Sequence, residues 1–152
     1  MPQSLRRSKH TAPPELRERL RSSNTAKQLG FVLVESGPGR VVLEMRVEER
    51  HKQVHGVVHG GVLAALADTA GGMATYMACR RGTRVATVEL KINYLDAVEG
   101  GRVLAEARVI RLGRHLAVVD CDLRDDGGRL VAKALLTFFV GPFRKKHTKS
   151  SR

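Results

Sequence analysis

The chain has 152 residues, which suits one folded domain, and 42% of them are hydrophobic, enough to form a core. It carries 27 basic and 15 acidic side chains, for a formal net charge of +12, and only two cysteines, Cys79 and Cys121, without a CxxC pair. This composition excludes a disulfide-dense scaffold, argues against wholesale disorder and gives no support to a zinc cluster. No apolar stretch follows the first basic residues, so we expect no secretory signal and a cytoplasmic protein.

The excess positive charge lies at the two ends of the chain. Residues 1–29 and 141–152 each carry +5, whereas residues 30–140 carry only +2. We therefore expect a basic flexible segment over 1–24, a folded domain over 25–141 and a basic tail over 142–152. The tails either keep the protein soluble or contact an anion. Because no RNA-binding or helix-turn-helix motif accompanies the charge, we expect no specific nucleic-acid partner.

Two strands and one long helix are predicted in the first half of the domain. Residues 31–36 and 40–47 are rich in β-branched side chains and flank Gly37-Pro38-Gly39, a pattern typical of two strands around a turn. Residues 59–79 are dominated by alanine, leucine and methionine, with apolar positions on nearly every side, which predicts a buried helix. This segment contains Asp68, which would cost roughly 2.5 to 3.5 kcal/mol at the bilayer centre, so we expect no membrane span.

Four strands joined by short turns are predicted in the second half. Residues 87–94 alternate strictly, and the apolar face of this strand comprises Val88, Leu90, Ile92 and Tyr94. Further strands are expected before Leu112, over 116–124 and over 130–140, the last two joined by Asp126-Gly127. Consecutive hairpins predict an antiparallel sheet. The fold class is therefore α+β, with the concave face of this sheet wrapped around one buried central helix.

Two positions of the helix indicate a reactive site. Asp68 is a carboxylate in the most apolar segment, where it must be either a hydrogen-bonded structural acid or a functional one. Gly60-Gly61 begins the helix, although serine or aspartate would cap it better. Without a Cβ, a ligand can reach the first backbone N–H groups, which are natural donors to a developing oxyanion. A tight strand-to-helix turn would also explain the two glycines.

The spacing of Gly60 and Asp68 along the helix leads to a prediction about how subunits associate. Eight residues of helix correspond to roughly 12 Å along the axis, so one substrate carbonyl cannot touch both. If both act on it, Asp68 must come from a second subunit whose helix runs antiparallel. This predicts a two-fold dimer with two composite sites.

Three histidines precede the helix. His51, His55 and His59 have the i, i+4, i+8 spacing that would align metal ligands on a helix. The intervening residues, with Gly56 and three β-branched valines, argue against a helix there, so we predict no metal site. His59 is expected to be a cap or structural donor at the helix start, or to contact substrate. Gln53 is a candidate to orient a water molecule or a carbonyl.

Gln53, the His59-Gly60-Gly61 triplet, Asp68 and the later segment VATVELKINYL together resemble the hotdog-fold acyl-CoA thioesterases of the PaaI type. The resemblance covers residues 25–141. It implies a hotdog fold, antiparallel dimers usually paired into tetramers, and hydrolysis of an acyl- or aryl-CoA to a carboxylic acid and free CoA without a metal or other cofactor.

The resemblance also implies roles for individual residues. The Gly60 N–H would polarise the thioester carbonyl, and Asp68 of the partner subunit would act as nucleophile or general base. Gln53 would position water or the thioester. Thr87 matches a serine or threonine that supports the carboxylate's water, although strand alternation predicts that it faces away from Val88 and Leu90.

The phosphates of CoA imply basic contacts, for which the candidates are Arg84, Arg111, Arg114 and, in the tail, Lys145. Two other functions stay open. A hotdog hydratase or dehydratase would bind similar substrates, but these enzymes resemble one another in a histidine-plus-acid pair whose spacing is absent here. A noncatalytic acyl-CoA-binding protein is the second alternative.

Overall fold

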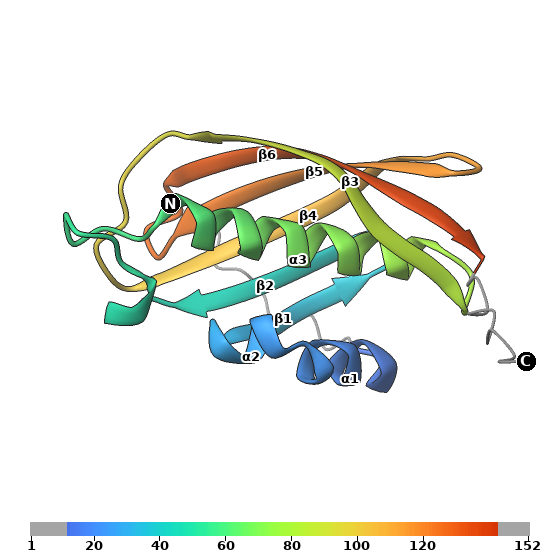
Figure 1. Cartoon of the computed structure of the whole chain (residues 1–152), viewed down its shortest axis with the longest axis horizontal. Coiled ribbons are helices and arrows are strands. Elements are labelled where there is room, and N and C mark those ends of the chain that lie inside the picture. The colour runs from blue at the N-terminus through green and yellow to red at the C-terminus, as the bar shows by residue number, and fades with distance from the viewer. Residues whose placement is uncertain (1–11, 143–152) are drawn as a thin grey trace, which may run out of the picture.

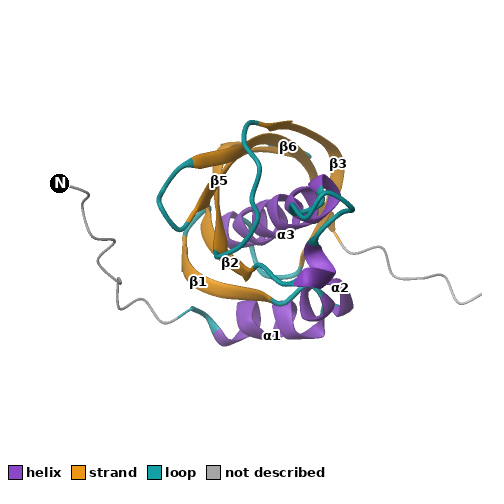
Figure 2. Ribbon diagram, turned by 90° about the vertical axis from the view of Figure 1, so that its left-hand side faces the viewer, coloured by secondary structure: helices purple, strands orange, loops and turns teal. Residues whose placement is uncertain are grey.

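The computed structural model describes residues 12–142. One antiparallel sheet curves around one long helix, as the sequence predicts (Figure 1, Figure 2). In chain order the elements are α1 (Pro14–Ser22), α2 (Asn24–Gln28), β1 (Phe31–Gly37), β2 (Arg40–Arg46), the 3-10 helix η1 (Glu49–His51), α3 (Gly60–Ala78), β3 (Thr83–Tyr94), β4 (Arg102–Leu112), β5 (Leu116–Asp125) and β6 (Leu130–Pro142).

The strand order is β1-β2-β4-β5-β6-β3, and every neighbouring pair is antiparallel. The antiparallel sheet is therefore confirmed, but the prediction of consecutive hairpins is wrong for β3 and β4, which are not paired. Helix α3 carries the chain across the concave face, so β3 joins the far edge beside β6, and β4 returns to pair with β2. Strand β3 is an edge strand of 12 residues within the described chain.

Helix α3 packs into the concave face of the sheet (Figure 2). Small residues on this side allow close approach to the sheet, notably Ala70, Gly71 and Ala74, which are all buried. The burial is nevertheless one-sided: Ala65, Asp68 and other residues on the opposite side of the helix are only half-buried in this chain. Helix α3 therefore has apolar residues on a side that the sheet of its own chain does not cover.

The prediction of flexibility over residues 1–24 is wrong for residues 12–24, the part of that segment that the structure describes. These residues form α1 and begin α2, and α1 lies along the edge of the sheet near β1 (Figure 1). Leu16 and Leu20, four residues apart, share one side of α1 and are buried. The charged residues occupy its solvent-facing side, so α1 is an amphipathic helix. The prediction was wrong because it relied on the net charge of the segment and not on the spacing of its leucines. The predicted C-terminal tail, apart from Pro142 in β6, lies outside the described residues.

Strand β3 contains a bulge that changes which side chains face the helix. Its register against β6 shifts between Thr87 and Glu89, which inserts one extra residue. The extra residue, Val88, is 59% exposed. The prediction that Val88 shares a face with Leu90 is therefore wrong, because the bulge resets the alternation between them.

No helix among residues 12–142 has the length and apolar character needed to cross a membrane.

Candidate active site

Asp68 lies near the middle of α3 and pairs with a residue of β3. The Thr87 hydroxyl donates a hydrogen bond of 2.7 Å to Asp68 Oδ1. Strict alternation placed Thr87 on the wrong face, and the bulge at Val88 is the reason that it faces the helix instead. The structure thus joins two sequence candidates that are 19 residues apart.

A cavity of about 190 Å³ opens over this pair. Most of its wall is apolar, and the polar groups of Asp68 and Thr87 meet at one part of it. The remaining lining residues come from α1, the loop after it, α3, β3 and β6: Arg19, Leu20, Ser23, Thr69, Gly72, Met73, Val85 and Phe138. An apolar hollow with a few convergent polar groups is the usual form of a small-molecule site.

Helix α1 contributes to this cavity, which sequence reasoning missed. Leu20 forms part of the wall, and the Arg19 guanidinium lies 4.5 Å from the centroid of the Tyr76 ring. Such a cation–π contact holds the arginine near the surface of α3. The signal that would have revealed α1 is the four-residue spacing of Leu16 and Leu20.

The start of α3 forms a second polar centre. His59 is the N-cap, and its Nδ1 accepts a hydrogen bond of 2.8 Å from the Gly61 N–H, which confirms the predicted cap. The Gly60 N–H has no acceptor within residues 12–142. It lies at the positive end of the helix dipole, so it is available to an oxyanion.

Tyr94 joins this second centre, and sequence reasoning counted it only as an apolar strand residue. Its hydroxyl donates a hydrogen bond of 2.8 Å to the Gly60 carbonyl. A shallow hollow of about 390 Å³ lies against the two residues. Its other walls are largely apolar and comprise Val57, Val58, Leu63, Leu95, Asp96, Ala97 and Val98.

The two centres are separate within one chain. The cavity at Asp68 and the hollow at Gly60 share no lining residue. Both residues are in α3, eight residues apart, which at 1.5 Å per residue is roughly 12 Å along the helix. Each chain therefore presents a carboxylate centre at Asp68 and a separate backbone-donor centre at Gly60.

Gln53 lies in the turn between η1 and α3. The His55 N–H donates to its side-chain oxygen, and its own N–H donates to the Val57 carbonyl at 2.9 Å. No hydrogen bond within the described chain joins Gln53 to Gly60 or Asp68. Its side chain stabilises its own turn in this structure.

The three histidines have different environments and are not on one helix. His51 is buried in η1, where its Nδ1 accepts a hydrogen bond of 3.0 Å from the Glu48 N–H. Burial lowers the pKa of His51, which favours the neutral ring that this hydrogen bond requires. The His51 carbonyl also accepts the His59 N–H at 2.8 Å, so the buried residue anchors the chain just before α3.

The predicted phosphate contacts Arg84, Arg111 and Arg114 are all exposed, and none has an ion-pair partner within the described residues. Arg84 is paired in register with Gly141, and the neighbouring Val140 N–H donates to the His115 carbonyl. Arg84 and Arg114 therefore lie at the same end of the sheet. Lys145 lies outside the described residues.

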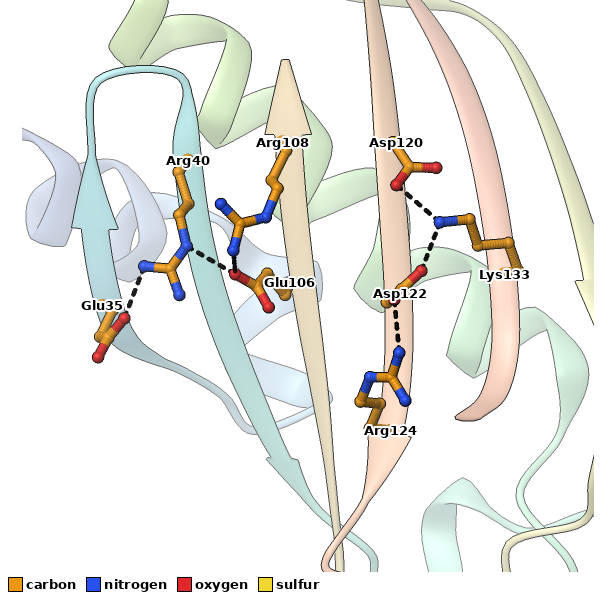
Figure 3. A network of polar contacts seen from close by, with 8 residues as sticks. All are labelled: Glu35, Arg40, Glu106, Arg108, Asp120, Asp122, Arg124 and Lys133. Atoms are coloured by element: carbon orange, nitrogen blue, oxygen red, sulfur yellow. Dashed lines mark hydrogen bonds and ion pairs between the residues drawn. The ribbon is translucent and has the colours of Figure 1, made fainter. Parts of the chain in front are cut away.

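The convex face of the sheet carries a different kind of polar surface (Figure 3). Arg40 bridges Glu35 and Glu106, and across the face Lys133 bridges Asp120 and Asp122. Although burial lowers the pKa of Lys133, its hydrogen bonds to the two aspartates raise it overall. The charged side chains drawn in Figure 3 are thus paired with one another.

Comparisons with known proteins identify the family. The model of the thioesterase superfamily matches residues 55–132, which include Gly60, Asp68 and Thr87. The chain belongs to the thioesterase superfamily. It is 33% identical to human acyl-coenzyme A thioesterase 13, over 80% of this chain and 88% of that protein. It is 35% identical to the proofreading thioesterase EntH of Klebsiella pneumoniae, over 71% of this chain and 80% of that protein.

Solved structures agree with this assignment. A thioesterase from Haemophilus influenzae superimposes with a TM-score of 0.82 at 32% identity, covering 90% of this chain and 96% of its own. The PaaI protein from the phenylacetic acid degradation operon of E. coli gives a TM-score of 0.75 at 25% identity, covering 81% and 88%. This thioesterase is thus a hotdog-fold thioester hydrolase of the PaaI type, as the sequence motifs predict.

Proposed function

We propose that this thioesterase hydrolyses an acyl-CoA, R-CO-S-CoA, with water to give a carboxylic acid and free CoA. The observation that carries the proposal is the Asp68–Thr87 pair at the wall of an apolar cavity. A carboxylate in this setting suits attack on an acyl carbon or activation of water beside it. The acyl-CoA thioesterase named among the relatives supports the choice of substrate class.

Each candidate residue has a distinct part in this reaction. Asp68 either adds to the thioester carbon, giving an anhydride that water then cleaves, or removes a proton from the attacking water. In both routes the carbon–sulfur bond breaks and the sulfur leaves as CoA thiolate, which takes up a proton. The Gly60 N–H stabilises the oxyanion, and loss of such a donor typically lowers kcat about 10²- to 10³-fold. Thr87 orients the carboxylate, and Gln53 positions water or the thioester.

The separation of the two centres is explained by a homodimer in which Gly60 of one subunit faces Asp68 of the other, so that each centre supplies half of a shared site. Two features support this assembly. The side of α3 that carries Asp68 is only half-buried, and the long edge strand β3 displays the exposed Val88. An unpaired edge strand is a ready site for association with a second chain. A pair of such dimers would form the proposed tetramer.

The size of the cavity at Asp68 indicates which acyl groups would fit there. Its volume of about 190 Å³ exceeds that of an engineered apolar cavity of roughly 150 Å³ that binds benzene. We therefore place a short aliphatic or aryl acyl group there. The exposed Arg84, Arg111 and Arg114 are the proposed contacts for CoA phosphates. The proposed location is the cytoplasm, whose reducing conditions suit the free Cys79 and Cys121.

Release of CoA from a panel of short, medium, long and aryl acyl-CoAs tests the function. The wild type is expected to hydrolyse at least one of them well above the uncatalysed rate, and Asp68→Asn is expected to abolish most of that rate. Wild-type rates at background across the panel would contradict the proposal. Retained acyl-CoA binding without any CoA release would instead indicate a noncatalytic binding protein.

Subunit mixing tests the composite sites. Asp68→Asn and Gly60→Pro each damage every site in their own dimers, the proline by removing the N–H at the first helical position, where helix geometry tolerates proline, and by displacing the neighbouring Tyr94 ring. Random exchange makes half of the dimers mixed, each with one intact site, so about one quarter of wild-type activity should return. The same two variants kept apart are the control. No recovery after demonstrated exchange would contradict a shared site.

A further inference from the structure

The peptide group between Gly60 and Gly61 is bonded by side chains at both ends. Its carbonyl accepts the Tyr94 hydroxyl at 2.8 Å, and its N–H donates to His59 Nδ1 at 2.8 Å. A peptide group is planar and rigid. Two hydrogen bonds from opposite sides therefore fix its orientation.

This fixation matters because the first residue of α3 is glycine. Gly60 joins the bonded peptide to the preceding one, and a glycine allows unusually free rotation about its backbone bonds. The preceding peptide is held through the His59 carbonyl, which accepts from Val62 N at 2.9 Å and Leu63 N at 3.3 Å. The Gly60 N–H belongs to this preceding peptide, and with both peptides held its direction is set.

The first turn of α3 consequently offers one backbone donor. The Gly61 N–H is taken by His59, and the Val62 and Leu63 N–H groups are taken by the His59 carbonyl. Within residues 12–142 only the Gly60 N–H of these four has no acceptor. A single donor must be well aimed to be effective, since such groups act through pre-organised geometry.

The Tyr94 ring also occupies the space that a side chain at position 60 would need, so the ring would have to move. A Cβ built on Gly60 would lie 2.9 Å from Tyr94 Cζ and 3.1 Å from its hydroxyl oxygen. Tyr94 is the last residue of β3, paired in register with Ala132 of β6, so its backbone is held by the sheet. Gly60 and Tyr94 therefore form a matched pair that ties the start of the helix to the sheet.

We propose that Tyr94 is a positioning residue for catalysis: its hydroxyl and ring hold the Gly60–Gly61 peptide and, through Gly60, the adjoining His59–Gly60 peptide, so that the Gly60 N–H is aimed at the substrate oxyanion. The proposal rests on the thioesterase function proposed above. It assigns no chemical step to Tyr94, which acts through Gly60.

Tyr94→Phe tests the hydroxyl alone. We expect kcat to fall about 3- to 10-fold, the usual worth of one neutral hydrogen bond, with KM and the melting temperature close to wild type. Tyr76→Phe, which removes the hydroxyl of the only other tyrosine in the sequence but keeps the ring that contacts Arg19, is the matched control and should leave kcat unchanged. An unchanged kcat in Tyr94→Phe, or an equal fall in Tyr76→Phe, would overturn the proposal.

Gly60→Ala tests the ring. The variant keeps the N–H, but its methyl group displaces the Tyr94 ring, so kcat should fall severalfold when Tyr94 is present. In a Tyr94→Ala background the methyl group has room, and the same change should have almost no further effect. Equal losses in both backgrounds would show that Gly60 is needed for another reason, such as substrate access, and would contradict the proposed pairing.

A substrate-free measurement separates this proposal from the proposed function. In ¹H–¹⁵N spectra, Tyr94→Phe should shift the amide resonances of Gly60 and Gly61, whereas Tyr76→Phe should not. A wild type that cleaves no acyl-CoA but shows these shifts would contradict the proposed function and leave the Tyr94 contact established. Unmoved glycine resonances would contradict the contact itself, whatever the activity.

Discussion

Thr87 reaches Asp68 because β3 carries one extra residue between Thr87 and Leu90. The hydrogen bond of 2.7 Å occupies Asp68 Oδ1, and Oδ2 has no hydrogen-bond donor within the described residues. One carboxylate oxygen is thus held while the other stays available for water or a carbonyl carbon. A bulge beside a reactive group that redirects a side chain is a known use of this irregularity.

Thr87→Val should lower kcat, because valine keeps the shape but loses the donor to a charged carboxylate. A hydrogen bond to a charged group is worth about 1.5 to 3 kcal/mol, so we expect a fall of roughly 10-fold or more, with most activity kept in Thr87→Ser. Steady-state kinetics with the best acyl-CoA provide the measurement. Thr137→Val on β6 is the control. Full activity in Thr87→Val would exclude the orienting role.

Gly71→Ala should destabilise the fold, whereas Gly72→Ala should not. A Cβ at position 71 would lie 3.0 Å from Phe138 Cε2, so that ring, which is 1% exposed, would have to shift within the packed core. Overpacking of this kind costs about 1 to 3 kcal/mol. At position 72 the distance to Phe138 is an ordinary 3.5 Å, and alanine gains up to about 1 kcal/mol in helix propensity.

Urea unfolding at one fixed protein concentration compares the two alanine variants with wild type. Equal effects of both substitutions on the free energy of unfolding would show that the Phe138 contact does not decide which glycine is required.

We expect His51 to make the protein less stable at acidic pH. The decrease should begin below about pH 6.5, the ordinary pKa of an unperturbed histidine. Burial, helped by the charge of Arg50, lowers the pKa of His51 in the folded state. The unfolded chain therefore binds this proton more readily, and the contribution of His51 to stability is present at higher pH and is lost as the pH falls through its folded-state pKa. One such group contributes up to about 1.4 kcal/mol per pH unit.

Urea unfolding between about pH 5 and pH 8 measures this loss. His51→Asn, whose oxygen can replace Nδ1 as acceptor for the Glu48 N–H, should show a smaller decrease than wild type. His55→Asn, at an exposed position, should retain the wild-type decrease. Identical pH dependence in wild type and His51→Asn would contradict the assignment.

Leu16→Ala should destabilise the protein by about 2 to 5 kcal/mol, as expected for removal of a fully buried leucine side chain. Arg17→Ala, at the exposed neighbouring position of α1, should change stability little. Thermal unfolding of both variants distinguishes a packed helix from a flexible segment. A melting temperature unchanged by Leu16→Ala would support the flexible N-terminus that charge alone suggested.

Much of the local structure could be predicted from the sequence. The strand over residues 40–47 and the helix over 59–79 agree with β2 and α3 within one residue at each end. The start of β3 was placed four residues late, because the segment from Thr83 to Ala86 has no clear period before the bulge. A bulge interrupts a two-residue period without leaving a distinct pattern, so alternation alone misassigns the face of Thr87.

Half of the site was also accessible from residue chemistry. An acid in an apolar helix and glycines at its start are unusual in any fold, so Asp68 and Gly60 stand out without a structure. Tyr94 and Arg19 do not, because a tyrosine in a strand and an arginine in a charged segment are ordinary. Their relevance comes from contacts with residues 34 positions away for Tyr94 and on another helix for Arg19.

The sequence by itself determined the elements, the helix cap and the separation of Gly60 from Asp68, because periodicity, capping and helical rise are local properties. The tertiary structure decided the strand order, the orientation of Thr87 and the hydrogen bond from Tyr94 to the Gly60 carbonyl. Those features depend on strand pairing and close packing between distant segments. Such contacts are selected by burial of the whole core, which no local pattern contains.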